Sequence, residues 1–194
     1  MKISVILGHP TPGSFNHALA KTAVETLSAF GHEVIFHDLY AENFDPILRT
    51  GEISRGAPAP EQIERHSAEI LSAEGVVIVH PNWWCQPPAI LKGWVDRVLR
   101  AGQAYRFEAS GAVGLLKART ALVITTANNP QENEVAMYGD PLEVFWKKVV
   151  FGLCGVPCER LIFSPVILST PDARAQWLQQ TADRLGGLFG RANS

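Results

Sequence analysis

The fold is decided by a stretch near the start of the chain that reads Ile3-Ser4-Val5-Ile6-Leu7-Gly8-His9-Pro10-Thr11-Pro12-Gly13-Ser14-Phe15-Asn16. It begins as a hydrophobic run typical of a buried strand, and a helical pattern follows the turn. Such a turn presents unpaired backbone N–H groups and the positive end of a helix dipole, where phosphate binds readily. Gly13 lets the backbone approach a ligand, and Ser14 and Asn16 add side-chain donors. Alternatively, Ser14 or Asn16 only caps the helix.

The same turn excludes two common nucleotide-binding motifs. It contains neither a Gly-x-Gly-x-x-Gly pattern nor the Gly-Lys-Ser/Thr ending of a triphosphate-binding loop, and it has no lysine. A monophosphate or pyrophosphate, held by backbone and hydroxyl groups, is the better match.

Strand-like and helix-like segments alternate along the rest of the chain. This alternation predicts right-handed crossovers and an α/β fold, a doubly wound five-stranded parallel sheet with helices on both faces. The chain is expected to be a single domain over residues 1–194. The expected strands are Ile3–Leu7, Glu33–His37, Val76–His80, Ala121–Thr125 and Arg160–Phe163, and the expected helices are Asn16–Phe30, Glu61–Ala73, Pro88–Arg100, Pro141–Leu153 and Pro171 to about Phe189.

One long stretch, Phe44–Pro60, has no regular pattern and is rich in glycine, proline and charge. A surface excursion, a dimer contact and a mobile segment are all compatible with it.

Composition limits the class of protein. The 194 residues are 46% hydrophobic, which suits one sizeable core, and the net charge of −2 gives no general attraction for nucleic acid or an anionic membrane. No signal-peptide pattern and no apolar stretch of about 20 residues is found. The three cysteines form no CxxC pair, and no histidine lies near them to complete a zinc set. A cytoplasmic protein with reduced thiols and no metal is expected.

Three loops should meet where the strand order of such a sheet switches direction. Besides the first turn, these are Pro81–Pro88, which contains Trp83 and Trp84, and Thr125–Pro130. Two adjacent tryptophans among prolines form a rigid aromatic wall, although such a pair could also be ordinary core residues. Backbone donors from 82–84 and hydroxyls from 125–126 could hold the polar edge of a flat ring. Beside a phosphate loop, this arrangement predicts a flavin mononucleotide or dinucleotide site.

The chain resembles the flavodoxin-like NAD(P)H:quinone oxidoreductases, which include bacterial quinone reductases and the ancillary reductase subunits of potassium efflux systems. The most specific passage is Pro88-Ala89-Ile90-Leu91-Lys92-Gly93-Trp94-Val95-Asp96-Arg97-Val98, leading to Ala104-Tyr105-Arg106-Phe107. The other passages are His9 with Ser14-Phe15-Asn16-His17-Ala18, His37-Asp38-Leu39-Tyr40 with Asn43-Phe44-Asp45-Pro46, and Thr125-Thr126 with Gly139-Asp140-Pro141.

The resemblance implies a bound FAD or FMN, with NADPH or NADH as the hydride donor. It places His9, Ser14, Phe15, Asn16 and Ala18 at the flavin phosphates, and Pro81, Asn82, Trp83, Trp84, Thr125 and Thr126 around the flavin ring. Asp96 and Arg174 match positions near the adenosine of FAD-binding members, which favours FAD slightly. Alternatively, Asp96 pairs with Arg100 and Arg174 is a solvated helix residue. Tyr105 and Phe107 match aromatics of the quinone pocket, often from the second subunit of a homodimer.

The chain departs from the family's animal members at two places. Tyr138 stands before Gly139-Asp140 where those members carry a histidine assigned to stabilise charge on the flavin. Its phenol could take over this catalytic role, or the ring could pack as a staple before Pro141. The loop between Thr126 and Tyr138 is polar and broken by proline, and Asn128 in it is a weaker candidate for the substrate pocket. Cys85 stands where the family often places an aromatic at the pocket wall.

Three further histidines are assigned structural positions. His32 and His66 lie in or beside helices, and both are expected at the surface. His80 ends a buried strand, and we expect a backbone carbonyl to satisfy its ring rather than a catalytic role.

The predicted function is the transfer of two electrons from NAD(P)H to a quinone or a similar flat electrophile, by a ping-pong mechanism. An alternative is a flavin-bearing regulatory subunit that docks on a membrane potassium efflux protein. An electron-carrier flavodoxin fits less well, because such carriers are strongly acidic. A serine hydrolase is not indicated, because the Gly-x-Ser-x-Gly elbow is missing.

Overall fold

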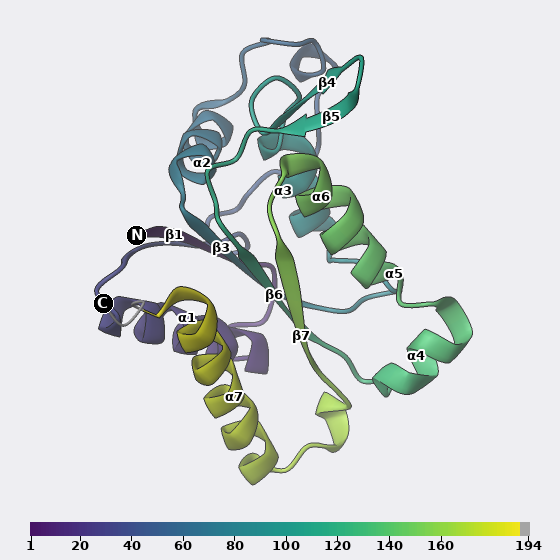
Figure 1. Cartoon of the computed structure of the whole chain (residues 1–194). Coiled ribbons are helices and arrows are strands. Elements are labelled where there is room, and N and C mark those ends of the chain that lie inside the picture. Colours follow the sequence, from purple (N-terminus) through teal and green to yellow (C-terminus); the bar gives the residue numbers. More distant parts are fainter. Residues whose placement is uncertain (191–194) are drawn as a thin grey trace.

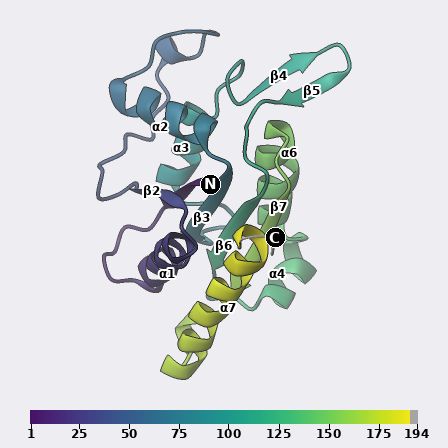
Figure 2. The ribbon, with the colours of Figure 1, turned by 60° about the vertical axis from the view of Figure 1, so that its left-hand side comes forward.

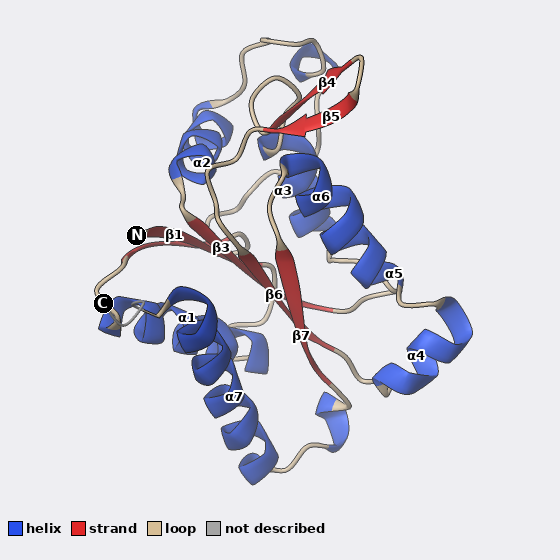
Figure 3. Cartoon of the chain, viewed as in Figure 1, coloured by secondary structure: helices blue, strands red, loops and turns tan. Residues whose placement is uncertain are grey.

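A computed structural model describes residues 1–190 and contains a central sheet of five parallel strands (Figure 1 and Figure 3). The spatial order β2-β1-β3-β6-β7 places the first strand inside the sheet, with later strands added on both sides. This confirms the predicted doubly wound α/β fold. The strands are β1 (Lys2–Leu7), β2 (Glu33–Asp38), β3 (Gly75–Pro81), β6 (Ala121–Thr126) and β7 (Cys158–Phe163).

Helices cover both faces of the sheet, and each face has its own hydrophobic core (Figure 2). Alternate residues of β3 explain this, because Val77 and Val79 point to one core and Val76 and Ile78 to the other. On one face lie α1 (Phe15–Ala29) and α7 (Pro171–Phe189). On the other lie α2 (Glu61–Ser72), α3 (Ala89–Val98) and a helical stretch over residues 141–154.

The helical stretch over 141–154 is less regular than predicted. It comprises α5 (Pro141–Glu143), a π-helical segment η2 (Val144–Val150) and α6 (Phe151–Cys154). The residues before it, predicted as a proline-broken loop, form the helix α4 (Gln131–Tyr138). Pro130 directly precedes this helix, and proline is tolerated at a helix start because its missing N–H would have no partner there.

A small antiparallel hairpin lies apart from the central sheet and was not predicted. It consists of β4 (Tyr105–Glu108) and β5 (Gly111–Gly114). Both strands are only four residues long and largely exposed, so the sequence carries little apolar alternation to indicate them.

The irregular stretch after Phe44 is held against α3. The Arg97 guanidinium is buried and donates from Nε and Nη2 to the two carboxylate oxygens of Glu52, at 2.9 and 2.8 Å. Arg97 also donates to the carbonyl of Asp45, and Glu52 ends a short 3₁₀ helix, η1 (Thr50–Glu52). The backbone of Pro46 lies directly against Gly93. Of the three alternatives, these contacts support a surface excursion that is packed on the domain.

No helix among residues 1–190 is both long and apolar enough to cross a membrane.

A short 3₁₀ helix, η3 (Val166–Leu168), connects β7 to α7.

Candidate functional site

A cavity of about 860 Å³ opens at the carboxyl edge of the sheet, beyond the ends of β1, β3 and β6. All three predicted loops contribute to it, together with α4 and the start of α7. The predicted site residues that line it are His9, Ser14, Phe15, Asn16, Pro81, Asn82, Trp83, Trp84, Cys85, Thr126, Asn128, Tyr138 and Arg174.

The first turn of α1 presents backbone donors to this cavity. Ser14 is the N-cap, and its Oγ accepts from the backbone N–H of His17 and lies 2.9 Å from His17 Nδ1. This confirms the capping alternative for Ser14. The N–H groups of Phe15 and Asn16 have no partner within the helix, because they belong to its first turn. These two N–H groups are therefore free to donate into the cavity.

The side chain of Asn16 is used inside the protein. Its Nδ2 donates to Thr126 Oγ1 at 2.9 Å, and the Thr126 hydroxyl lies 3.2 Å from Asn16 Oδ1, so the two buried groups satisfy each other. The pair ties the start of α1 to the end of β6. These two side chains hold two loops of the site together, and the second N–H of the Asn16 amide is not used by this pair.

His9 faces the same cavity as a neutral imidazole. Its Nδ1 accepts from the backbone N–H of Thr11 at 3.1 Å, which leaves the ring proton on Nε2. Desolvation by burial lowers the pKa of His9 below its ordinary value, in agreement with this state. His9 can therefore donate one hydrogen bond into the cavity from Nε2.

The second tryptophan, Trp84, and the next residue, Cys85, form a strained two-residue turn. The backbones of Trp83 and Gln86 exchange two hydrogen bonds of 3.0 Å, and the residues between them, Trp84 and Cys85, have φ values of 54° and 59°. Glycine or asparagine is usual at such positions, and other residues there cost about 1–3 kcal/mol each. The Trp84 side chain is 98% exposed, so it is not a core residue.

The donors predicted on this loop are mostly occupied. The N–H of Asn82 donates to the carbonyl of Thr126 at 2.7 Å, and the N–H of Trp83 is part of the turn, so only Trp84 keeps a free N–H. The hydroxyl of Thr125 is buried, and Thr125 lines a much smaller hollow behind the loop. The polar edge of a bound ring would thus meet fewer backbone donors than the sequence predicted.

Arg174 supplies a positive charge to the cavity from the first turn of α7. Its Nε donates to Ser169 Oγ at 2.8 Å, and its guanidinium carbon lies 5.7 Å from the centre of the Phe15 ring. The guanidinium is thereby fixed beside the start of α1, where the free N–H groups are. Arg174 is also exposed, so lining the cavity and being a solvated helix residue are both compatible with its position.

Besides Thr125, four predicted residues do not line the cavity. Ala18 lies one turn into α1, and Asp96 pairs with Lys92 at 2.6 Å rather than with Arg100. Asp96 and Tyr105 line a separate hollow with residues 48–56. Phe107 is 70% exposed on the hairpin. Tyr138 does line the cavity, but it is 57% exposed at the end of α4 and does not pack as a staple.

Glu134 is the ionisable residue of the cavity lining that sequence reasoning missed. It lies on α4 and is buried, and its Oε2 accepts from Nδ2 of Asn82 at 2.6 Å. Burial, and then the Glu134 carboxylate, raise the pKa of the Cys85 thiol above its ordinary value. The run of acidic residues after Pro130 is a helix-start signal that could have indicated α4.

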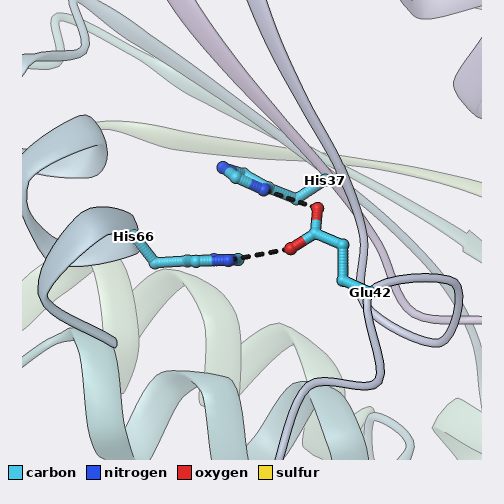
Figure 4. Close-up of side chains that lie close together, drawn as sticks. All are labelled: His37, Glu42 and His66. Carbon is cyan, nitrogen blue, oxygen red and sulfur yellow. Dashed lines mark hydrogen bonds and ion pairs between the residues drawn. The ribbon is translucent and has the colours of Figure 1, made fainter. Parts of the chain in front are cut away.

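A second cluster of titratable groups lies between β2 and α2 (Figure 4). Figure 4 shows the Glu42 carboxylate facing the rings of both His37 and His66. Its Oε1 lies 2.8 Å from His37 Nδ1, and its Oε2 lies 2.9 Å from His66 Nε2. His66 is 1% exposed, so the predicted surface position is wrong. It packs inward because Trp94 Nε1 donates to His66 Nδ1 at 3.0 Å, and this bond puts the ring proton on Nε2, toward Glu42.

The His37–Glu42–His66 cluster is better suited to hydrogen bonds than to a metal. A metal ion would need the Nε2 lone pair of His66, and that nitrogen carries the proton. The second nitrogen of His37 lies 2.7 Å from Glu69 Oε2. The expectation that the chain binds no metal stays a prediction.

His80 has the structural role predicted for it. It is fully buried, its Nδ1 donates to the carbonyl of Pro81 at 2.8 Å, and its Nε2 accepts from Trp146 Nε1 at 2.9 Å. Desolvation by burial lowers the pKa of His80 to about 4. The ring is therefore neutral and holds β3 against η2.

Comparison with known proteins identifies the class. The family model described as a flavodoxin-like fold matches residues 1–187. An uncharacterized NAD(P)H oxidoreductase of Haemophilus influenzae is 33% identical, with 93% of this chain and 92% of that protein aligned. NAD(P)H dehydrogenase (quinone) 1 of Rattus norvegicus is 31% identical, with 93% and 75% aligned.

A solved structure agrees with these relatives. The NAD(P)H:quinone oxidoreductase from Methanothermobacter marburgensis superposes with a TM-score of 0.83 at 27% identity, covering 96% of this chain and 97% of that one. The chain thus has the flavodoxin-like fold. It belongs to the flavodoxin-like family of NAD(P)H oxidoreductases and quinone reductases.

Proposed function

We propose that this protein is a flavin-dependent enzyme that transfers two electrons from NADPH or NADH to a quinone or a similar flat electrophile. The observation that carries the proposal is the cavity at the carboxyl edge of the sheet, where free N–H groups lie beside an aromatic turn. Its volume is in the range of ligand sites. The names of the aligned relatives support the reaction class.

The residues present fit a flavin. Its phosphate would be held by the backbone N–H groups of Phe15 and Asn16, with His9 and Arg174 beside them. Its ring would lie against Trp83 and Trp84. When bound, a flavin takes up a hydride from the nicotinamide and supplies two electrons to the acceptor. The protein orients both partners and excludes water from the reacting face.

One cavity for donor and acceptor implies a ping-pong mechanism, because the nicotinamide must leave before the acceptor can enter. An anaerobic titration of the flavin-reconstituted protein with NADPH and NADH tests the first half. Stoichiometric bleaching of the visible flavin bands, reversed by benzoquinone, is the expected result. Steady-state kinetics test the second half, since intersecting instead of parallel double-reciprocal lines would contradict the shared site.

The choice between FAD and FMN depends on groups near the adenosine. Arg174 lines the cavity and Asp96 does not, so a single chain offers only one of the two residues expected near the adenosine. We propose FAD. Fluorescence titration of the apoprotein with FAD and FMN in parallel tests the choice, and a tighter dissociation constant for FMN would contradict it.

We further propose that the protein is a homodimer. Phe107 on the hairpin is 70% exposed, and Ile47 and Ile53 of the 44–60 stretch are also exposed, which is costly in a monomer. A second copy would cover these side chains and could bring Tyr105 and Phe107 to its partner's site. Sedimentation of the protein tests this directly. A monomer at micromolar concentration would argue against it.

A further inference from the structure

The cavity carries two side-chain charges of opposite sign, and they belong to different parts of its wall. Among residues 1–190, the ionised side chains of the lining are Arg174 and Glu134. Arg174 is fixed beside Phe15 at the start of α1, and Glu134 contacts Asn82 in the loop after β3. The helices that carry them, α7 and α4, lie on different sides of the sheet edge (Figure 1). The phosphate side of the cavity is therefore positive and the other side negative.

Among residues 1–190, no cation forms an ion pair with Glu134. The Arg160 guanidinium lines the same small hollow as Glu134, but its Nη1 is bound to Asp140 and Glu143 at 2.8 and 3.1 Å. The side chains that contact the Glu134 carboxylate directly are neutral, namely the amide of Asn82 and the thiol of Cys85. A carboxylate that is hydrogen-bonded but not ion-paired keeps its field, which acts strongly across a poorly solvated cavity.

The small hollow behind Glu134 can solvate this carboxylate. Its volume of about 10 Å³ is close to that of a single water site. Three residues that line it have buried polar atoms without a protein partner, namely Asn82 Oδ1, Thr125 Oγ1 and Arg160 Nε. Such a polar chamber lowers the cost of burying a charge beside it.

The neighbouring groups add no compensating charge. The Cys85 thiol lies beside Glu134, and its raised pKa keeps it neutral near pH 7. Tyr138 and Asn128 complete this side of the cavity as neutral side chains. Glu134 is therefore the lining side chain that sets the electrostatic sign on this side of the cavity, and Asp140, which lies outside the lining, has the same sign.

We propose that Glu134 is a specificity-determining residue, whose negative charge makes the cavity favour neutral or cationic electron acceptors over anionic ones of the same size. The selection of acceptors rests on the proposed oxidoreductase function. The charge map, by which we mean the positive side of the cavity at Arg174 and the negative side at Glu134, does not rest on it. Repulsion by one carboxylate at close range is expected to disfavour an anion by about 3- to 10-fold.

The charge map is tested on the apoprotein through Cys85. Cys154 is buried, and burial raises the pKa of the partly exposed Cys158 to about 12, so Cys85 is the thiol that reacts first. Iodoacetamide is neutral and iodoacetate is anionic, and both alkylate the same thiolate. The ratio of their rates therefore cancels any change in the pKa of Cys85 and reports the local potential. We expect Glu134→Gln to lower the iodoacetamide-to-iodoacetate ratio by about 3- to 10-fold. The glutamine oxygen can still accept from Asn82, so the fold is preserved.

The matched control is Glu132→Gln, which removes one negative charge from the same helix at an exposed position outside the lining. We expect this variant to keep the wild-type ratio, and Cys85→Ser to abolish the labelling. An unchanged ratio in Glu134→Gln, or an equal drop in Glu132→Gln, would overturn the charge map.

The acceptor selection is tested by comparing a neutral naphthoquinone with its sulfonated analogue. The ratio of their kcat/KM values should fall by about 3- to 10-fold in Glu134→Gln, and should shift less at high salt. Turnover with an unchanged acceptor ratio would overturn this inference while leaving the oxidoreductase intact. A protein that binds no flavin, yet shows the alkylation shift, would overturn the proposed function and leave the charge map standing.

Discussion

Two buried histidines show how a single hydrogen bond decides the charge of a side chain. Both His80 and His66 accept a hydrogen bond from a tryptophan N–H on one ring nitrogen, and donate from the other. A ring that accepts at one nitrogen is neutral. Burial lowers the pKa of each, so protonation would require the hydrogen bond to break and the charge to be desolvated.

Stability should therefore fall as the pH drops from 6.5 toward 4. The folded-state pKa of His80 is about 4, below its unfolded value of about 6.5, so the unfolded chain binds the extra proton in this window. The contribution of His80 is fully present above pH 6.5 and amounts to roughly 3 kcal/mol. Urea unfolding at a series of pH values measures it.

His80→Gln separates this contribution from those of His66 and His9, whose lowered pKa values act in the same direction. A glutamine amide can donate to the carbonyl of Pro81 and accept from Trp146. Between pH 6.5 and pH 4, the free energy of unfolding of the variant should fall by roughly 3 kcal/mol less than that of the wild type. Parallel pH profiles for the two proteins would refute the assignment.

At the scale of elements, Gly93 explains why the long irregular stretch has a fixed place. A Cβ added at this position of α3 would lie 2.2 Å from the carbonyl oxygen of Pro46 and 2.5 Å from its Cα. The chain after Phe44 can approach the helix only because this side chain is missing. The same approach lets Arg97 reach the carbonyl of Asp45 and the carboxylate of Glu52.

Gly93→Ala is expected to destabilise the fold by about 1–3 kcal/mol, although alanine favours helices. The backbone of Pro46 must move, and the contacts of Arg97 weaken with it. Gly187→Ala in α7 is the matched control, because a Cβ there meets nothing within 4 Å. This control should gain about 0.5–1 kcal/mol. Thermal unfolding measures the change in melting temperature of each variant, which should be negative for Gly93→Ala and positive for Gly187→Ala. Equal changes in the two variants would contradict the packing argument.

The elements that could be predicted from the sequence are those whose apolar pattern is strong. The central strands β1, β3 and β6 are buried on both faces and read as continuous apolar runs. Helix α4 was missed because it is polar and carries only a weak apolar face, and the hairpin because its strands are short and exposed. Glu134 lies on α4, so missing the helix also hid this residue. His66 was misplaced because its tryptophan partner is 28 residues away.

At the scale of the whole molecule, the cavity joins chain segments that only the sheet brings together. The pair formed by Asn16 and Thr126 links positions 110 residues apart, and it fixes the first loop against the third. Sequence reasoning predicted this convergence from strand order alone. It could not predict that the two side chains satisfy each other, because reciprocal hydrogen bonds depend on the final register of α1 against β6.

Because such a cavity spans the fold, a ligand in it should stabilise the whole chain. A flavin at 100 times its dissociation constant would add about 2.7 kcal/mol, which raises the melting temperature by roughly 5–10 °C in a protein of this size. Arg174→Ala should weaken flavin binding about tenfold, since it removes one charge-assisted contact, and should halve this shift. Arg184→Ala on the same helix is the control, because its ion pair with Glu159 is at the surface and outside the cavity. If the two variants lose the flavin-induced shift equally, Arg174 does not contact the ligand, and the positive side of the cavity consists of the α1 terminus alone.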